Sequence, residues 1–517
     1  MQHRVQYPEN GESVHDVADE GAVRGSMIAT SLVGHLLELT SSVDKSRNPA
    51  DYIASSFFRE KHYLGARDRR FISENLFGMI RHRRFIEALL EEHIRLHPED
   101  SHLDAPRVRY LPLFVAYAVC VDSQSVADSG DRTGGGIDHD FSDPSGNEDH
   151  RNSIAGIDSL WITYFPRSDL SSFVHSLRAL QHLDFIQPDR RNTEETLQPH
   201  HERDIDVDLL RLAVKYSFQD WMVQDWNNQL GPETERLLES LNTPARVTLR
   251  VNLAKTTRED CRLRLLSEGI ETDPTLVSPA GLTAHKRFNA QASETFKAGW
   301  FELQDEGSQL LSLICEPRPG SVVIDGCAGA GGKSLHLADL LKGEGEIIAI
   351  DVDPSRLREL ESRTRRAGVT IIKPILRGRV EQGQLSGDIV LVDAPCTGVG
   401  TIRRNPALKW RVSEASVHQH ADYQRRLLDF YHRCVKPGGE LVYTTCSLLK
   451  EENEEVVGPF LSFHPEFRLR RIEAGVCPPS MITAEGFLRV LPYHADTDGF
   501  FAARMMREDF ASRRSIS

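Results

Sequence analysis

The sequence predicts an α/β protein whose C-terminal part is a doubly wound sheet, preceded by an all-α region and a small α+β module. Between Met27 and Cys120, apolar residues recur at intervals of three and four, which is typical of helices that bury one face. Residues 246–254 alternate like a strand between helical segments, which indicates a compact α+β module. After Gly307, runs rich in Val and Ile alternate with helical segments, as in a sheet that binds ligands at the carboxyl ends of its strands: SVVIDGCA, GEIIAIDVD, TIIKPI, DIVLVDAPC, GELVYTTCS and GFFAARMM.

These patterns divide the chain of 517 residues into successive parts. Residues 1–25 are predicted to be a disordered leader, and residues 26–186 a helical domain. The segment 123–153 is rich in Gly, Ser and Asp and has almost no large apolar residue, so we expect it to be a disordered acidic insert in that domain. Residues 205–306 form the predicted α+β module, and residues 307–510 the predicted sheet domain.

The net charge of −14 is concentrated in a few segments. Residues 1–20 carry −4 and residues 122–158 carry −7, so the remaining 460 residues carry only −3. The stretch from Arg377 to Arg411 carries +3, and a basic patch of this kind can hold phosphates whatever the global charge. The alternative for that stretch is a solvated charged surface.

Composition places the chain among folded proteins outside membranes. Hydrophobic residues make up 39% and charged residues 27%, which is ordinary for a globular protein. There is no run of eighteen apolar residues and no signal-peptide pattern, so we expect a cytoplasmic protein without a membrane partner. Eight cysteines occur without CxxC spacing, which predicts reduced thiols and no metal site.

A glycine-rich turn follows the first strand of the sheet domain, at Asp325-Gly326-Cys327-Ala328-Gly329-Ala330-Gly331-Gly332-Lys333. The P-loop pattern fails because position 327 is cysteine, and GxGxxG from Gly329 fails because its sixth position is Ser334. An acidic residue followed by glycines four and six positions later is the turn that S-adenosylmethionine enzymes use. Asp351 ends the second strand and is placed to accept hydrogen bonds from ribose hydroxyls. The alternatives are a structural tight turn or another nucleotide.

Two cysteines, Cys396 and Cys446, follow the fourth and fifth strands. Those strands are neighbours in a methyltransferase-type sheet, so both thiols are expected beside the cofactor turn. A lone buried cysteine is usually a small hydrophobe, but two at strand ends fit methylation of carbon 5 of a pyrimidine. A thiolate that adds to carbon 6 makes carbon 5 nucleophilic, and a second thiol suits the release step. The Asp393 carboxylate could bond the ring's amidine edge.

At these positions the chain resembles the Nop2/Sun RNA cytosine-5 methyltransferases. The resemblance extends from about 216 to 505, in the segments YSFQDWMVQDW, LRVN, LQDEGSQL, DGCAGAGGK, DAPCTGVGTIRRNPALKWR, YTTCSLLKEENEEVV and TDGFFAARM. It implies a Rossmann-like S-adenosylmethionine methyltransferase sheet, a ribosomal RNA substrate from the small subunit, and a monomer without metal.

The resemblance also implies roles for single residues. Cys446 would attack carbon 6, Cys396 would assist release, and Asp393 and Lys333 would complete the catalytic set. Lys333 would lie between the cofactor and the target nucleotide, where its charge favours thiolate at Cys446; its alternative is a surface helix residue. The expected cofactor-binding residues are Cys327, Ala328, Gly329, Ala330, Gly331, Gly332, Lys333, Asp351 and Asp393.

Residues 52–84 resemble the NusB-like helical RNA-binding domain that precedes the catalytic part in such enzymes. The expected phosphate contacts are the Arg-Asp-Arg-Arg run at 67–70 and Arg81, Arg83 and Arg84. A purely structural helical domain is the alternative. Two features depart from the family: Arg377 and Arg379 stand at the end of the third strand, where an acidic residue is common, and the insert 123–153 interrupts the helical domain.

Two other functions compete with a methyltransferase that acts on RNA. The first is a non-enzymatic RNA-binding or ribosome-assembly factor that keeps the fold. The intact set of Cys396, Cys446, Asp393 and Lys333 disfavours it. The second is a DNA cytosine-5 methyltransferase, which the Thr-Cys motif and the upstream domains disfavour.

Overall fold

The computed structural model describes residues 32–46, 48–106, 108–122, 157, 160–181, 206–380, 385–473 and 475–509. The chain forms two compact units, Met1–Ser217 and Phe218–Ser517. The predicted leader (1–25) and the predicted insert (123–153) lie outside the described residues. Among the described helices, none is long and apolar enough to cross a membrane.

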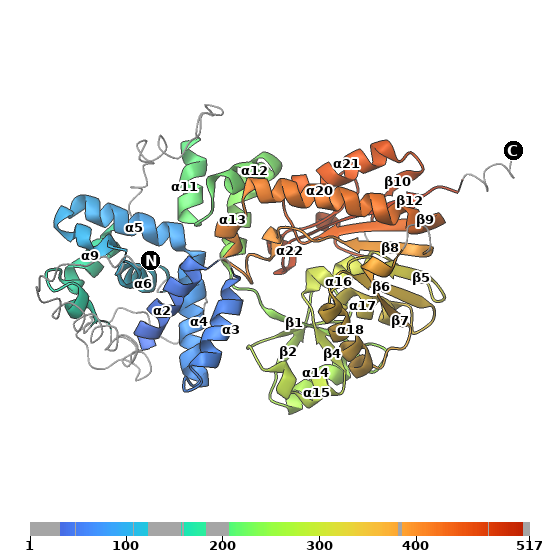
Figure 1. Ribbon diagram of the computed structural model, residues 1–517, viewed down its shortest axis with the longest axis horizontal. Helices are drawn as coiled ribbons and strands as arrows, with labels where there is room; N and C mark the ends of the chain where they lie inside the picture. The colour runs from blue at the N-terminus through green and yellow to red at the C-terminus, as the bar shows by residue number, and fades with distance from the viewer. Residues whose placement is uncertain are drawn as a thin grey trace, which may run out of the picture. The chain divides into compact units, whose positions relative to one another are not determined.

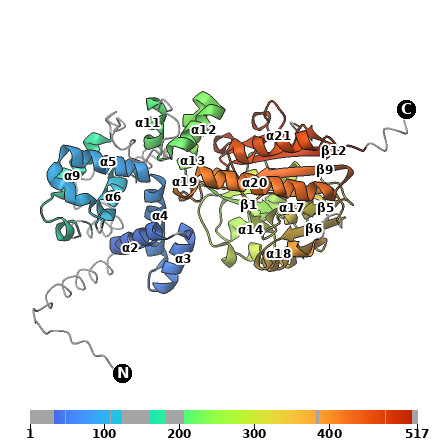
Figure 2. The ribbon, with the colours of Figure 1, turned by 45° about the horizontal axis from the view of Figure 1, so that its top comes forward.

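The first unit is helical throughout its described residues (Figures 1 and 2). Most of these helices bury one face, as the spacing of apolar residues predicts: α5 buries Ile86, Leu89 and Leu90, whereas α6 is buried on all sides. The elements are α2 (Leu32–Lys45), α3 (Ala50–Glu60), α4 (Ala66–Arg81), α5 (Arg83–Leu96), η1 (Pro98–Asp104), α6 (Tyr110–Tyr117), η2 (Ala118–Asp122), α9 (Leu170–Leu180) and α11 (Val207–Lys215).

The second unit begins with a small α+β module. Four antiparallel strands form a sheet in the order β2-β3-β1-β4, and the strand predicted around 246–254 is β1, at the interior of this sheet. The elements are α12 (Asp220–Leu230), η3 (Gly231–Glu233), α13 (Thr234–Asn242), β1 (Val247–Val251), α14 (Arg258–Ser267), β2 (Thr272–Pro274), β3 (Gly281–Ala284), η4 (Ala290–Ala292), α15 (Glu294–Lys297) and β4 (Phe301–Leu303).

An eight-stranded sheet follows, in the order β10-β12-β9-β8-β5-β6-β7, with β11 paired to β12. The predicted doubly wound α/β class is confirmed: β7, β6, β5, β8 and β9 are parallel, and β12 runs antiparallel beside β9. The strands are β5 (Val322–Asp325), β6 (Glu346–Asp351), β7 (Ile372–Leu376), β8 (Gly387–Asp393), β9 (Val435–Thr445), β10 (Phe467–Arg470), β11 (Leu488–Val490) and β12 (Phe500–Arg507).

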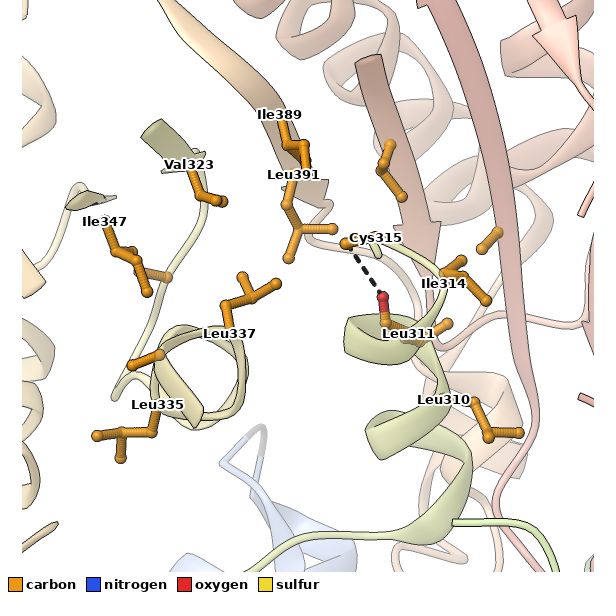
Figure 3. Packing of buried hydrophobic residues seen from close by; sticks show 14 of the residues in the cluster. Leu310, Leu311, Ile314, Cys315, Val323, Leu335, Leu337, Ile347, Ile389 and Leu391 are labelled. Atoms are coloured by element: carbon orange, nitrogen blue, oxygen red, sulfur yellow. Dashed lines mark hydrogen bonds between the residues drawn. The ribbon is translucent and has the colours of Figure 1, made fainter. Parts of the chain in front are cut away.

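Helices cover both faces of this sheet, and each face has its own apolar core. Residues of α16, α17 and α18 pack against one face, and Figure 3 shows the side chains of α16 and α17 meeting those of β5, β6 and β8. Residues of α20 and α21 pack against the other face. The connecting elements are α16 (Glu306–Leu313), α17 (Gly332–Leu340), α18 (Pro354–Ala367), η5 (Arg377–Arg379), η6 (Val399–Thr401), α19 (Leu408–Arg411), α20 (Glu414–Tyr431), η7 (His432–Cys434), η8 (Lys450–Glu452), α21 (Glu454–Phe463), η9 (Pro479–Met481) and α22 (Pro492–Ala495).

Buried polar side chains join the small module to the sheet domain. Arg250 of β1 is fully buried, and its guanidinium donates to the carbonyl of Gly332 and to Oε1 of Gln304, each at 2.7 Å. The Asn252 amide donates to the carbonyls of Gly299 (3.0 Å) and Ala367 (3.1 Å). Through Arg250 the module therefore contacts the backbone at the start of α17, next to the glycine-rich turn.

Candidate active site

The glycine-rich turn connects the end of β5 to the start of α17, and its conformation requires glycine. Gly331 has a left-handed backbone (φ 84°), and a Cβ there would lie 1.9 Å from Cδ1 of Leu360. Gly329 is also left-handed (φ 55°), but the nearest atom to a Cβ would be 3.9 Å away. The turn therefore packs closely against α18 at Gly331 and leaves open space beside Gly329.

The carboxylate of Asp351 ties this turn to the end of β6. Its Oδ2 accepts from the N–H of Gly329 and its Oδ1 from the N–H of Asp353, both at 2.8 Å. Asp351 therefore lies beside the turn, and its contact with ribose hydroxyls stays a prediction. Val352, directly after β6, is 64% exposed and offers an apolar surface beside Asp351.

Asp325, the last residue of β5, is buried under the turn. Its Oδ2 accepts from the Ser334 hydroxyl (2.7 Å), whereas its Oδ1 has no hydrogen-bond partner within the described residues. Burial raises the pKa of Asp325 to about 6, although the Ser334 hydroxyl opposes this. A buried acceptor without a partner is costly, so the site suits a ligand that brings a donor, such as an ammonium group.

The two predicted thiols lie together at the ends of neighbouring strands. β8 and β9 pair in parallel, with Asp393 opposite Thr444. Cys396 follows the end of β8 after two intervening residues, and Cys446 follows the end of β9 directly. The Sγ atoms of Cys396 and Cys446 are 3.2 Å apart, and all eight cysteines of the chain are free. The topology thus brings together two residues separated by fifty positions.

Lys333 reaches from the first turn of α17 to the same strand ends. Its Nζ donates to Oδ2 of Asp393 (2.7 Å), and the Thr444 hydroxyl donates to Oδ1 of Asp393 (2.9 Å). Burial lowers the pKa of Lys333, but the charges of Asp393 and Cys446 outweigh burial and raise it overall. A charged lysine therefore pairs with Asp393 within the electrostatic reach of Cys446, and because its side chain is only 13% exposed, the alternative of a surface lysine is wrong.

The environments of Cys396 and Cys327 keep protons on their thiols. The hydrogen bond to Cys446 raises the pKa of Cys396 well above its ordinary value, and burial and Glu452 add to this. Burial likewise raises the pKa of Cys327, helped by Asp325 and Asp393. Of the three, Cys446 is the thiol with a charged lysine beside it.

The arginines at the end of the third strand take no part in this cluster. β7 ends at Leu376, and the Arg377 guanidinium lies 4.7 Å from the ring of Phe430 and 5.3 Å from that of Tyr431. Arg379 is exposed. The carboxylate that the family commonly has here is replaced by a cation that stacks on α20.

Three cations of the basic stretch before α20 have structural partners within the protein. At these three positions neither phosphate binding nor a solvated charged surface describes the side chain. Arg403 is buried and donates to the carbonyls of Thr243 and Thr497. Arg404 binds the carboxylates of Asp305 and Asp498. Lys409 is buried with its Nζ 3.7 Å from the ring centroid of Phe218 and donates to Asn242. These cations join the small module to the sheet domain.

The predicted phosphate contacts of the first unit differ in exposure. Arg67 and Arg70 are exposed, and Arg70 pairs with Glu74. Arg83 is half-buried and pairs with Asp44 and Glu87. Arg81 is buried at 9% exposure, so the prediction that it contacts phosphate is not supported by its position.

Sequence reasoning missed two buried residues beneath the thiols, Glu452 and Asn453. Glu452 accepts from Thr397, which follows Cys396, and Asn453 bonds to Thr445 and Ser447, on either side of Cys446. Both belong to the segment YTTCSLLKEENEEVV that carries the resemblance, but no spacing rule links them to Cys396, which lies more than fifty residues earlier.

Comparisons with known proteins agree with this arrangement. Residues 312–506 match the family described as 16S rRNA methyltransferase RsmB/F, and residues 218–291 match the ferredoxin-like domain of RsmF/B-like methyltransferases. A probable ribosomal RNA small subunit methyltransferase B of Bacillus subtilis is 32% identical over 59% of this chain and 69% of its own length. Its counterpart in Synechocystis is 29% identical over 87% and 93%. The crystal structure of PH0851 has a TM-score of 0.64 at 27% identity and covers 92% of this chain and 97% of its own.

Proposed function

We propose a reaction for this chain, which belongs to the RsmB/F family of 16S rRNA methyltransferases: methyl transfer to carbon 5 of a cytosine in small-subunit ribosomal RNA through a covalent adduct. The observation that carries the proposal is the pair of Sγ atoms, 3.2 Å apart, beside the glycine-rich turn. A reaction that needs one thiol to attack and another to assist release needs such a pair.

The turn fits S-adenosylmethionine as cofactor. The unpartnered Oδ1 of Asp325 would accept from its ammonium group, and the open space at Gly329 leaves room for its methionine part. Asp351 would accept from ribose hydroxyls and Val352 would face the base. When bound, this cofactor supplies an electrophilic methyl group. The remaining predicted contacts are Asp393 and the other residues of the turn, Cys327, Ala328, Ala330, Gly331, Gly332 and Lys333.

The chain's own residues then perform the chemistry on the cytosine. The Cys446 thiolate adds to carbon 6 and forms an S–C bond. The electron pair of the 5,6 double bond moves to the 4,5 bond and that of the 3,4 double bond to nitrogen 3, so that carbon 5 becomes the nucleophilic carbon of an enamine. Asp393, held by Lys333 and Thr444, would accept a hydrogen bond from the amino group at the amidine edge and orient the ring for this addition. After carbon 5 is methylated, loss of its proton to a base restores the double bond and expels Cys446. Cys396 lies where it can assist this elimination.

RNA is the substrate that the family implies, and the two upstream parts are proposed to hold it. The small module would bind RNA next to the sheet domain. The helical unit would act as a NusB-like RNA-binding domain through its exposed arginines, Arg67 and Arg70.

The proposal is tested first with Cys446→Ala, assayed for radiolabelled methyl transfer to transcribed 16S rRNA. We expect loss of incorporation, because carbon 5 is no longer activated. The matched control is Cys434→Ala, which removes a buried thiol at the opposite end of the same strand. Incorporation by Cys446→Ala near the rate of this control would refute the assignment.

The second test is Cys396→Ala. We expect it to accumulate a protein–RNA adduct that survives a denaturing gel when cofactor and RNA are present, because addition proceeds and elimination stalls. An absence of adduct in this variant, with normal adduct chemistry in the Cys434→Ala control, would show that release is not the task of Cys396.

A further inference from the structure

Two consecutive buried residues lie under the two thiols. Glu452 ends η8 and is 0% exposed, and Asn453, which precedes α21, is 4% exposed. Each is bonded to a different one of the two loops that carry Cys396 and Cys446. Neither belongs to the catalytic set described above.

Glu452 holds the loop that carries Cys396. Its Oε1 accepts from the N–H of Thr397 (2.9 Å) and from the amide of Gln424 (3.1 Å), and its Oε2 accepts from the Thr397 hydroxyl (2.5 Å). The same Gln424 amide donates to the carbonyl of Pro395 (3.0 Å). The residues immediately before and after Cys396 are therefore both fixed, one directly and one through Gln424.

Asn453 holds the loop that carries Cys446. Its Oδ1 accepts from the Thr445 hydroxyl (2.6 Å), and its Nδ2 donates to the carbonyl of Ser447 (3.1 Å). These are the residues immediately before and after Cys446. The Tyr443 hydroxyl donates to the carbonyl of Glu452 (2.6 Å), which anchors the pair of residues to β9 itself.

The two cysteine loops also contact each other directly, which further restricts their relative position. The N–H of Gly400 donates to the carbonyl of Cys446 (2.9 Å), and a Cβ at Gly400 would lie 2.2 Å from the carbonyl oxygen of Gly499. A buried carboxylate and amide are costly unless their hydrogen bonds are made, so a displacement of either loop would leave Glu452 or Asn453 unsatisfied.

We propose that Glu452 and Asn453 are positioning residues that set the two thiols in register, Glu452 for the release thiol and Asn453 for the attacking thiol. The division of roles rests on the proposed function. Glu452 also helps to keep the proton on Cys396, because its charge raises the pKa of that thiol. The two adjacent residues thus control different steps of one reaction.

The experiment compares Glu452→Gln, Asn453→Asp and the control Glu455→Gln, which makes the same chemical change on a half-exposed carboxylate that pairs with Lys450. Single-turnover adduct formation and its decay are measured with 16S rRNA and S-adenosylmethionine. Glu452→Gln removes the negative charge and replaces the oxygen that accepts from the Thr397 hydroxyl with an amide donor. We expect decay to slow by about 10- to 100-fold, with adduct accumulating.

Asn453→Asp removes the donor to Ser447 and puts a carboxylate oxygen against its carbonyl. We expect adduct formation to slow by about 10- to 100-fold without accumulation. Equal slowing of both steps in both variants, or rates equal to those of Glu455→Gln, would overturn the inference. If a variant does not fold, Thr397→Val and Thr445→Val each remove one hydroxyl bond to Glu452 or Asn453 and carry the same expectations.

The outcome separates this inference from the proposed function. If the cysteine variants behave as expected and the two positioning variants do not, the positioning inference alone fails. If Asn453→Asp accumulates adduct and Glu452→Gln slows attack, positioning is supported and the roles of the two thiols are exchanged.

Discussion

The cofactor turn and the two cysteine loops lie at the same edge of one sheet, yet they are held in different ways. The turn is fixed by the left-handed backbone of Gly331, packed against Leu360, and by one carboxylate, that of Asp351, which accepts from the N–H of Gly329. The cysteine loops are fixed by side chains from a later segment, Glu452 and Asn453. A larger residue at Gly331 should therefore disturb the conformation of the turn. A changed donor or acceptor at Glu452 or Asn453 should disturb the position of the cysteine loops.

Lys333 is the residue that joins the two regions, so its loss should have the largest effect. Lys333→Met removes the cation beside Asp393 and Cys446. We expect the rate at saturating cofactor to fall by about 100-fold. The pH midpoint of the chemical step should move upward, because the thiolate loses a favourable neighbour. Single-turnover rates between pH 6 and pH 10 measure both. Weaker cofactor binding with an unchanged pH profile would limit Lys333 to a binding role.

Adding one carbon to the turn should cost stability. Gly331→Ala forces a left-handed alanine and pushes Leu360 aside, so we expect the free energy of unfolding to fall by about 2 to 3 kcal/mol. Gly329→Ala is the matched control, since a Cβ there meets no atom within 3.9 Å. Urea unfolding compares the two. Equal losses would mean that the contact with Leu360 does not constrain the turn.

Asp325 gives the turn a pH dependence that the cysteine loops should not share. The pKa of Asp325 is about 6 in the folded protein against 3.8 for an ordinary aspartate, so between these values the unfolded chain binds fewer protons. Stability contributed by this group is therefore lost as the pH rises through that window. We expect Asp325→Asn to raise the free energy of unfolding at pH 7 by about 1 to 2 kcal/mol, and not at all below about pH 4. Urea unfolding without cofactor across this range checks the sign.

The smallest expected effect concerns a single hydrogen bond from a hydroxyl to Asp393 at the cysteine end. Thr444→Val removes the hydroxyl that donates to Oδ1 of Asp393 and keeps the shape of the side chain. We expect the methyl-transfer rate to fall by about fivefold. Cofactor affinity, measured by calorimetry, should stay unchanged. A loss of cofactor affinity instead would show that Asp393 contacts the cofactor and not the target cytosine.

Local patterns and sheet topology explain what could be predicted. The turn could be read because its conformation depends on adjacent glycines, and the thiol pair because neighbouring parallel strands bring their carboxyl ends together. Glu452 was missed because its contact with Thr397 spans fifty-five residues and follows no period. The structural role of Arg403 could not be predicted, because a charge count cannot tell an exposed arginine from one that donates to buried backbone carbonyls.

The hydrogen bond from Arg250 to the Gly332 carbonyl limits which truncated chains and which hybrids with relatives can keep an intact turn. A shortened chain that starts at Gly307 would lose the guanidinium that supports the first residue of α17, and with it a support of the methyl-donor site. A hybrid that takes the small module from a relative needs an arginine at the equivalent place in its first strand. The small module and the sheet domain therefore have to be kept together when the chain is shortened or recombined, although each has an apolar core of its own.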